Sequence, residues 1–141
     1  MISEFFVVGT IKRAGYYTDN CLYFTGKRNK HGWKVALEWL CYWVNLCSKD
    51  TFGIIVAFNG NIAFFPLKLN KTLDPSIDQK NSILIRKDEI ESIKVSPAFL
   101  AKRITVKRVS GKSVSFTVEK KNEIIKSHER NLNEFIEKYT N

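Results

Sequence analysis

The side chains that most often carry out catalysis or bind metals are few in this chain of 141 residues. The three cysteines are Cys21, Cys41 and Cys47, and none of them forms a C-x-x-C pair of the kind found in zinc and redox sites. His31 lies in a polar segment, and His128 falls on the apolar side of a helical pattern, where a histidine packs at the core. The glycine-rich phosphate-binding motifs of nucleotide enzymes are also absent from the sequence. We therefore expect a protein without enzymatic activity, with no cofactor and no metal.

Positive charge is the stronger chemical signal. Lysine and arginine number 23 against 14 acidic residues, a net charge of +9. The stretch from Lys94 to Lys121 holds eight of the basic residues and one acidic residue, Glu119. Such a surface suits phosphate groups of lipid head groups or nucleic acid, although a solvated basic face that maintains solubility is the alternative. The candidate ligand-binding residues are Lys102, Arg103, Lys107, Arg108 and Lys112, joined by Lys27 and Arg28 if the two basic regions meet.

A second basic region, residues 12–34, supports an alternative hypothesis. Tyr16, Tyr17, Tyr23 and Phe24 lie there near lysines and arginines in the sequence, as base-stacking aromatics do beside cations that bind phosphates. The alternative is therefore a nucleic-acid-binding protein that uses the basic and aromatic region 12–34. No RNP-like, KH-like or helix-turn-helix signature accompanies the region.

Apolar residues make up 44% of the chain, which is enough to form a core that positions the basic residues. Its longest run, residues 33–47, places its polar residues on one narrow stripe and predicts a very apolar helix, with a strand as the alternative. Its tryptophans, Trp33, Trp39 and Trp43, either pack in the core or form a partner interface, which would also allow a homo-oligomer through residues 33–47. The run is too short to span a bilayer and the N-terminus lacks a basic leader, so we expect a cytoplasmic protein.

The remaining pattern predicts antiparallel strands and one amphipathic C-terminal helix. Asn59-Gly60 between two apolar runs predicts a hairpin with a type I′ turn, and Ser110-Gly111 predicts a second hairpin. Residues 26–32, 69–82 and 97–101 are expected to be loops or connections. The expected strands are 5–13, 16–25, 52–58, 62–67, 83–85, 90–95, 103–109 and 114–118, and the helix covers about 124–139.

One segment within this pattern resembles a known family. The run Asp88-Glu89-Ile90-Glu91-Ser92-Ile93-Lys94-Val95 is similar to a strand of bacterial pleckstrin-homology-like (PH-like) and GRAM-like domains. The hairpin 104–118 follows at the family's spacing, and 132–138 resembles the helix that closes the family's barrel. The resemblance covers about residues 52–139, and the helix near 33–47 departs from it. The lysine and Lys/Arg-x-Arg pattern of phosphoinositide-binding members is not cleanly present, so we carry over no inositol phosphate specificity.

The resemblance implies a mainly β (α+β) fold, a PH-like bent antiparallel sheet or barrel with a C-terminal capping helix, to which the apolar run adds an inserted helix near 33–47. The length of the chain and the absence of internal repeats and linkers predict one domain over residues 1–141. The family's usual role is binding a lipid or a protein. We therefore expect a non-catalytic interaction module in the cytoplasm, peripheral to the membrane, that binds an anionic lipid head group or a protein partner through its basic rim.

Overall fold

The structure is a computed structural model that describes residues 3–29, 51–69, 75–78, 81–98, 100–122 and 125–140. The helix expected near residues 33–47, with Trp33, Trp39 and Trp43, lies outside the described residues. The elements, in chain order, are α1 (Glu4–Ala14), β1 (Leu22–Asn29), β2 (Thr51–Phe58), β3 (Asn61–Leu69), β4 (Pro75–Ile77), β5 (Ile83–Ile85), the 3-10 helix η2 (Lys87–Glu89), β6 (Ile90–Ala98), β7 (Ala101–Arg108), β8 (Ser113–Glu119) and α3 (His128–Tyr139).

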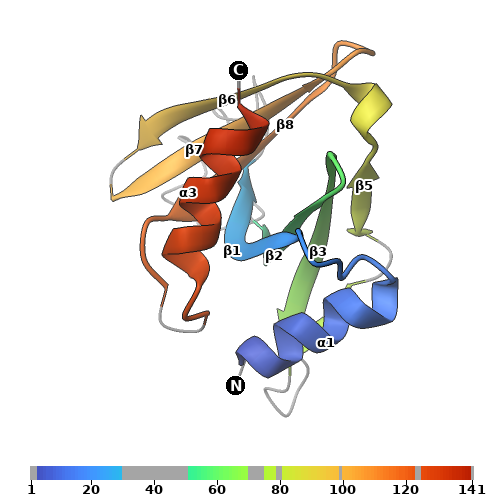
Figure 1. The fold of residues 1–141 in the computed structure, drawn as a ribbon, viewed down its shortest axis with the longest axis vertical. Coiled ribbons are helices and arrows are strands. Elements are labelled where there is room, and N and C mark those ends of the chain that lie inside the picture. Colours follow the sequence, from blue (N-terminus) through green and yellow to red (C-terminus); the bar gives the residue numbers. More distant parts are fainter. Residues whose placement is uncertain are drawn as a thin grey trace, which may run out of the picture.

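The fold is mainly β, as the sequence predicts. Eight strands form one antiparallel sheet in the order β4-β3-β2-β1-β8-β7-β6, and β5 pairs with β3. Strand β1 pairs with β2 over residues 22–28 and with β8 over residues 27–29, so it links the two halves of the sheet. Figure 1 shows β1 bending sharply between these halves. Gly26 permits the close approach, because a Cβ there would lie 2.9 Å from both Ile55 Cδ1 and Val118 Cγ2.

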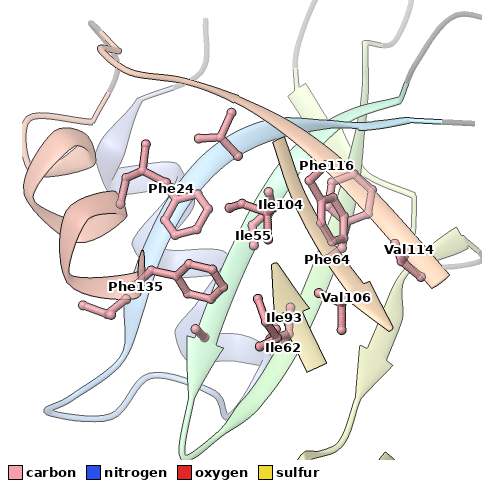
Figure 2. Close-up of a cluster of buried hydrophobic side chains, with 14 of the residues drawn as sticks. Phe24, Ile55, Ile62, Phe64, Ile93, Ile104, Val106, Val114, Phe116 and Phe135 are labelled. Atoms are coloured by element: carbon pink, nitrogen blue, oxygen red, sulfur yellow. The ribbon is translucent and has the colours of Figure 1, made fainter. Parts of the chain in front are cut away.

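The bend brings side chains from both halves into one core. The ring of Phe64 in β3 lies 5.3 Å from that of Phe116 in β8, although two strands separate β3 from β8 in the sheet. Helix α3 covers one end of this core, where Phe135 meets the edge of Phe24 at 5.5 Å (Figure 2). The C-terminal amphipathic helix and its buried Leu132 and Phe135 are thus confirmed, but the helix begins at His128 rather than near residue 124, because residues 125–127 form a turn before it.

The prediction of a strand over residues 5–13 is wrong, because this segment forms helix α1. The Ser3 hydroxyl accepts the Phe6 N–H at 3.2 Å and caps the N-terminus, while Gly15 ends the helix at φ 80°. Val7 and Ile11 are fully buried in a second cluster with residues of β2 and β3, on the outer side of the sheet. Burial against the sheet therefore outweighs the β propensity of the segment.

Three other boundaries differ from the prediction. The second strand begins at Leu22 rather than residue 16, and it continues through the expected loop 26–32 as far as Asn29. Pairing of Lys27 with both Phe52 and Thr117 holds this polar stretch extended. The loop expected over 69–82 contains β4, and the connection expected over 97–101 is mostly strand, because β6 runs to Ala98 and β7 starts at Ala101.

Both predicted hairpins are confirmed. Asn59 and Gly60 have φ values of 50° and 85°, the left-handed pair that a type I′ turn requires, and Gly111 turns β7 into β8 at φ 94°. The short strand 83–85 is also present, as β5. Within the described ranges, no helix combines the length and apolar character needed to cross a membrane.

Candidate anion-binding surface

The alternation of side chains along the strands divides the predicted basic residues between two faces of the sheet. In β7, Lys102 and Arg108 share a side with the buried Ile104, whereas Arg103 and Lys107 point to the outer side. In β1, Arg28 is on the side of the buried Phe24 and Lys27 is on the outer side. Lys112 is exposed in the β7–β8 turn. The structure therefore brings the two basic regions together, but as two surfaces rather than one rim.

The outer surface is formed by neighbouring strands of one half of the sheet. One row of paired residues runs from Lys27 through Thr117 to Arg103 and Ser96. The next row runs from Asn29 through Ser115 and Thr105 to Lys94. Lys107 pairs with Ser92 and Ser113 in a third row. We call this surface the outer cationic face and define its charged members as Lys27, Lys94, Arg103 and Lys107.

Polar side chains fill the space between these cations. Asn29 Nδ2 donates to Thr117 Oγ1 at 2.8 Å and to Ser115 Oγ at 3.3 Å, so these three side chains hold one another in place. Sequence reasoning missed Asn29, Lys94 and the hydroxyls as site residues. The signal that could have found them is the period-two alternation of Ser115 and Thr117 with apolar residues in β8.

Within the described ranges, acidic residues compensate little of this charge. Lys107 Nζ lies 3.5 Å from Glu91 Oε2, and both side chains are about half exposed. Among the described residues, this ion pair alone includes a member of the outer cationic face. Glu119, at the end of β8, forms no ion pair with this face. Lys27, Lys94 and Arg103 are exposed and available to an anionic ligand. Hydroxyl donors beside free cations can bind phosphate oxygens by charge-assisted hydrogen bonds.

The core-facing surface holds Arg28 and Arg108, both half-buried. Burial lowers the pKa of Arg28 from its ordinary value, and the positive charge of Arg108 lowers it further. Arg108 Nε is buried, and no group of the described chain accepts its hydrogen. The two guanidinium groups therefore act on each other electrostatically at one end of the sheet.

Three of the four aromatics named for the nucleic-acid alternative are engaged within the fold. Tyr16 stacks on Phe58 with ring centroids 4.4 Å apart, and Phe24 is fully buried. The Tyr23 hydroxyl donates to Glu4 at 3.3 Å. Tyr17 alone of the four is exposed, at 45%, and the Lys12 ammonium lies 5.0 Å from its ring centre. This arrangement leaves one of the four aromatics open to stack on a base.

His128 lies at the core, as predicted. Its Nε2 is 2.6 Å from the Glu119 carbonyl oxygen, and because a carbonyl only accepts, the proton is on Nε2. Its ring meets the edge of Phe24 at 6.1 Å. No group of three or more metal-ligating side chains is found in the part of the chain that the structure describes. Neither a scan against models of protein families nor a search of curated proteins finds a match to this chain.

Proposed function

We propose that the protein is a non-catalytic, PH-like interaction module that binds anionic lipid head groups at the cytoplasmic surface of a membrane. The order of the sheet and the helix over one end of its core support the resemblance to PH-like and GRAM-like domains. That resemblance in turn favours a lipid or protein ligand over catalysis.

The outer cationic face is the observation that carries this proposal. It places four cations on one side of the β1-β8-β7-β6 half of the sheet, with Glu91 offsetting Lys107. A basic residue near an anionic membrane contributes about 1 kcal/mol, so the three cations that form no ion pair with another described residue contribute roughly 3 kcal/mol. That is about a 100-fold preference for an anionic over a neutral surface.

A membrane fits this face better than nucleic acid does. Binding of single strands without sequence preference relies on aromatic platforms beside the cations. Of the four aromatics that would provide such platforms, Tyr16, Tyr23 and Phe24 contact other parts of the fold instead. Tyr17 alone is exposed, which leaves a single platform. Cations and hydroxyls alone are sufficient for head-group phosphates and carboxylates.

Co-sedimentation with lipid vesicles tests the proposal. We expect binding to vesicles of phosphatidylcholine with phosphatidylserine, and none to phosphatidylcholine alone. The double variant Lys27→Glu/Arg103→Glu should lose this binding. Lys126→Glu/Arg130→Glu, at exposed positions before and on α3, changes the net charge equally and should retain it.

A mobility-shift assay with single-stranded and duplex DNA at two salt concentrations completes the test. Binding to DNA but not to either vesicle would overturn the proposal in favour of the nucleic-acid alternative. Equal loss of vesicle binding in the two double variants would also overturn it, because net charge rather than this face would then be responsible.

A further inference from the structure

The hairpin of β6 and β7 ends in a turn whose residue types are unusual for its geometry. Its last paired residues are Ala98 and Ala101, so two residues separate the strands. The hairpin turns at 59–60 and 110–111 use asparagine and glycine for their left-handed positions, the residue types that adopt this conformation most easily. Leu100 instead has a φ of 55°, which a leucine rarely adopts. The turn therefore keeps an apolar side chain at a position that favours glycine or asparagine.

The side chain of Leu100 is exposed to solvent as well. Leu100 is 72% exposed, and residues 97–101 carry no ionisable or hydrogen-bonding side chain. Figure 1 shows the ends of β6 and β7 projecting beyond α3 at the edge of the molecule. We call the described members of this segment, Pro97, Ala98 and Leu100, the apolar tip. Its transfer from water to an apolar environment is favourable.

Cations follow the apolar tip directly. Lys102 and Arg103 come next in β7, and the alternation of side chains places Arg103 in the outer cationic face and Lys102 on the opposite side. At about 3.3 Å per strand residue, Arg103 lies within roughly 10 Å of Leu100 along the strand. Apolar side chains of interfacial elements enter the boundary of head groups and acyl chains by about 5–10 Å. At that depth of Leu100, Arg103 is level with the head groups.

The charge beside the tip is mainly positive among the described residues. Glu119 in β8 is the cross-strand partner of Ala101, and Lys120 and Lys121 follow it, both exposed. Arg103 is one pair further along the same strands, opposite Thr117. The apolar tip therefore borders a surface whose sign is complementary to anionic lipids.

Other exposed apolar side chains lack this combination. Phe5 is 90% exposed, but it follows Glu4 at the start of α1, which packs on the β2 and β3 half of the sheet. Val109 is 67% exposed, but the polar turn residues Ser110 and Gly111 follow it. An exposed apolar turn and the outer cationic face coincide at the β6–β7 hairpin.

We propose that the apolar tip enters an anionic membrane at the boundary of head groups and acyl chains, while Arg103 contacts the phosphates. This inference rests on the proposed function and adds to it the part of the chain that penetrates the membrane. The apolar contribution of Leu100 is not screened by salt, whereas that of the cations weakens as salt concentration rises. The residue that strains the turn thereby contributes to binding.

Leu100→Asn tests the tip without damaging the turn, because asparagine adopts the left-handed conformation readily but is polar. We expect its melting temperature to equal or exceed that of the wild type. Its partition coefficient on vesicles of phosphatidylcholine with phosphatidylserine should fall at least about five-fold, since roughly half of a leucine side chain no longer leaves water. Val109→Asn is the matched control at another turn and should leave the partition coefficient unchanged.

Salt dependence separates the apolar from the electrostatic contribution. The ratio of the wild-type partition coefficient to that of Leu100→Asn should be the same at low and high salt. The corresponding ratio for Lys27→Glu/Arg103→Glu should decrease at high salt, because the ions screen the removed charges. A Leu100→Asn ratio that falls to one at high salt would contradict insertion of an apolar side chain.

NMR of methyl groups measures the depth on the wild-type chain, so it does not depend on how any variant folds. In bicelles of the same two lipids, a nitroxide near the top of the acyl chain should broaden the Leu100 methyl signals more than those of Val109. Equal broadening of the two residues, or none, would refute insertion of the tip.

The vesicle assay distinguishes failure of this inference from failure of the proposed function. If Lys27→Glu/Arg103→Glu loses binding and Leu100→Asn retains it, the outer cationic face binds the membrane and insertion of the tip is refuted. If Leu100→Asn and Val109→Asn weaken binding equally, the tip has no particular role and the inference is refuted as well. If the wild type does not bind anionic vesicles, both the proposed function and the insertion are refuted.

Discussion

Replacing Phe135 by alanine tests whether α3 is held to the sheet by the packing described above. Phe135 is 1% exposed, contacts the edge of Phe24 at 5.5 Å and stacks on Tyr139 at 4.9 Å. Truncating a buried phenylalanine to alanine destabilises a protein by about 3–5 kcal/mol. Each aromatic contact adds about 0.5–1.5 kcal/mol beyond the buried area. Because Phe135 makes two such contacts, we expect a loss in the upper part of the range for a buried phenylalanine, about 4–5 kcal/mol in the free energy of unfolding of Phe135→Ala.

Urea denaturation followed by circular dichroism measures this loss. Phe5→Ala is the matched control, because Phe5 is 90% exposed on α1 and the same substitution there should change the free energy by less than about 0.5 kcal/mol. Phe135→Leu keeps most of the volume and should remain folded, with a loss of about 1–1.5 kcal/mol. Equal effects of Phe135→Ala and Phe5→Ala would refute the packing of α3 described here.

Three further predictions concern single residues. Gly60→Ala should destabilise the protein by about 1–3 kcal/mol in urea denaturation, because φ is 85° and the new Cβ would lie 2.7 Å from Lys87 Cδ. Gly111→Ala, at φ 94° with open space around it, should cost less, and the reverse order would contradict the turn geometry. Asn131→Ala should cost about 1–3 kcal/mol in the same assay, since Asn131 Nδ2 donates to the Tyr23 carbonyl at 2.9 Å in a buried position; no change would show that this bond is not formed. Burial raises the pKa of Tyr23 above its ordinary value of 10.0, so the unfolded chain releases this proton first and stability should fall as pH rises beyond about 10. Tyr23→Phe should show a shallower fall in denaturation curves over that pH range, and an identical fall would assign it to other groups.

The parts of the fold that were predicted correctly carry their signal locally. Asn59-Gly60 specifies its turn through the left-handed conformation that both residues adopt. The C-terminal helix repeats apolar residues at three- and four-residue steps, and those residues, Leu132 and Phe135 among them, are the ones that are buried. Where one short segment contains all the residues that determine its conformation, the sequence alone is sufficient to predict that conformation.

Helix α1 was missed although its boundary signals are present. Its interior is rich in phenylalanine, valine, isoleucine and threonine, which favour strands. Ser3 followed by Glu4, and Gly15 after Lys12 and Arg13, are the cap and charge signals of a helix. The helix is favoured over a strand because Val7 and Ile11 are buried on the outer side of β2 and β3. This burial depends on residues more than forty positions away in the sequence.

The division of the basic residues between two faces was only half predictable. Alternation of side chains along β7 is enough to place Arg108 on the side of Ile104 and Lys107 on the other side. Residues 26–32 were predicted as a loop, so the sequence assigned no face to Lys27 and Arg28. The extension of β1 to Asn29 follows from pairing with Thr117 and Phe116, nearly ninety positions later, which no local pattern reveals.

The most direct test of the central claim is the partition coefficient of Lys27→Glu/Arg103→Glu on phosphatidylserine-containing vesicles, relative to the wild type. Removing two cations at about 1 kcal/mol each predicts at least about a 30-fold decrease. Under the same conditions Lys126→Glu/Arg130→Glu should stay within a few-fold of the wild type. A partition coefficient of Lys27→Glu/Arg103→Glu equal to that of the wild type would contradict the claim that the outer cationic face binds the membrane.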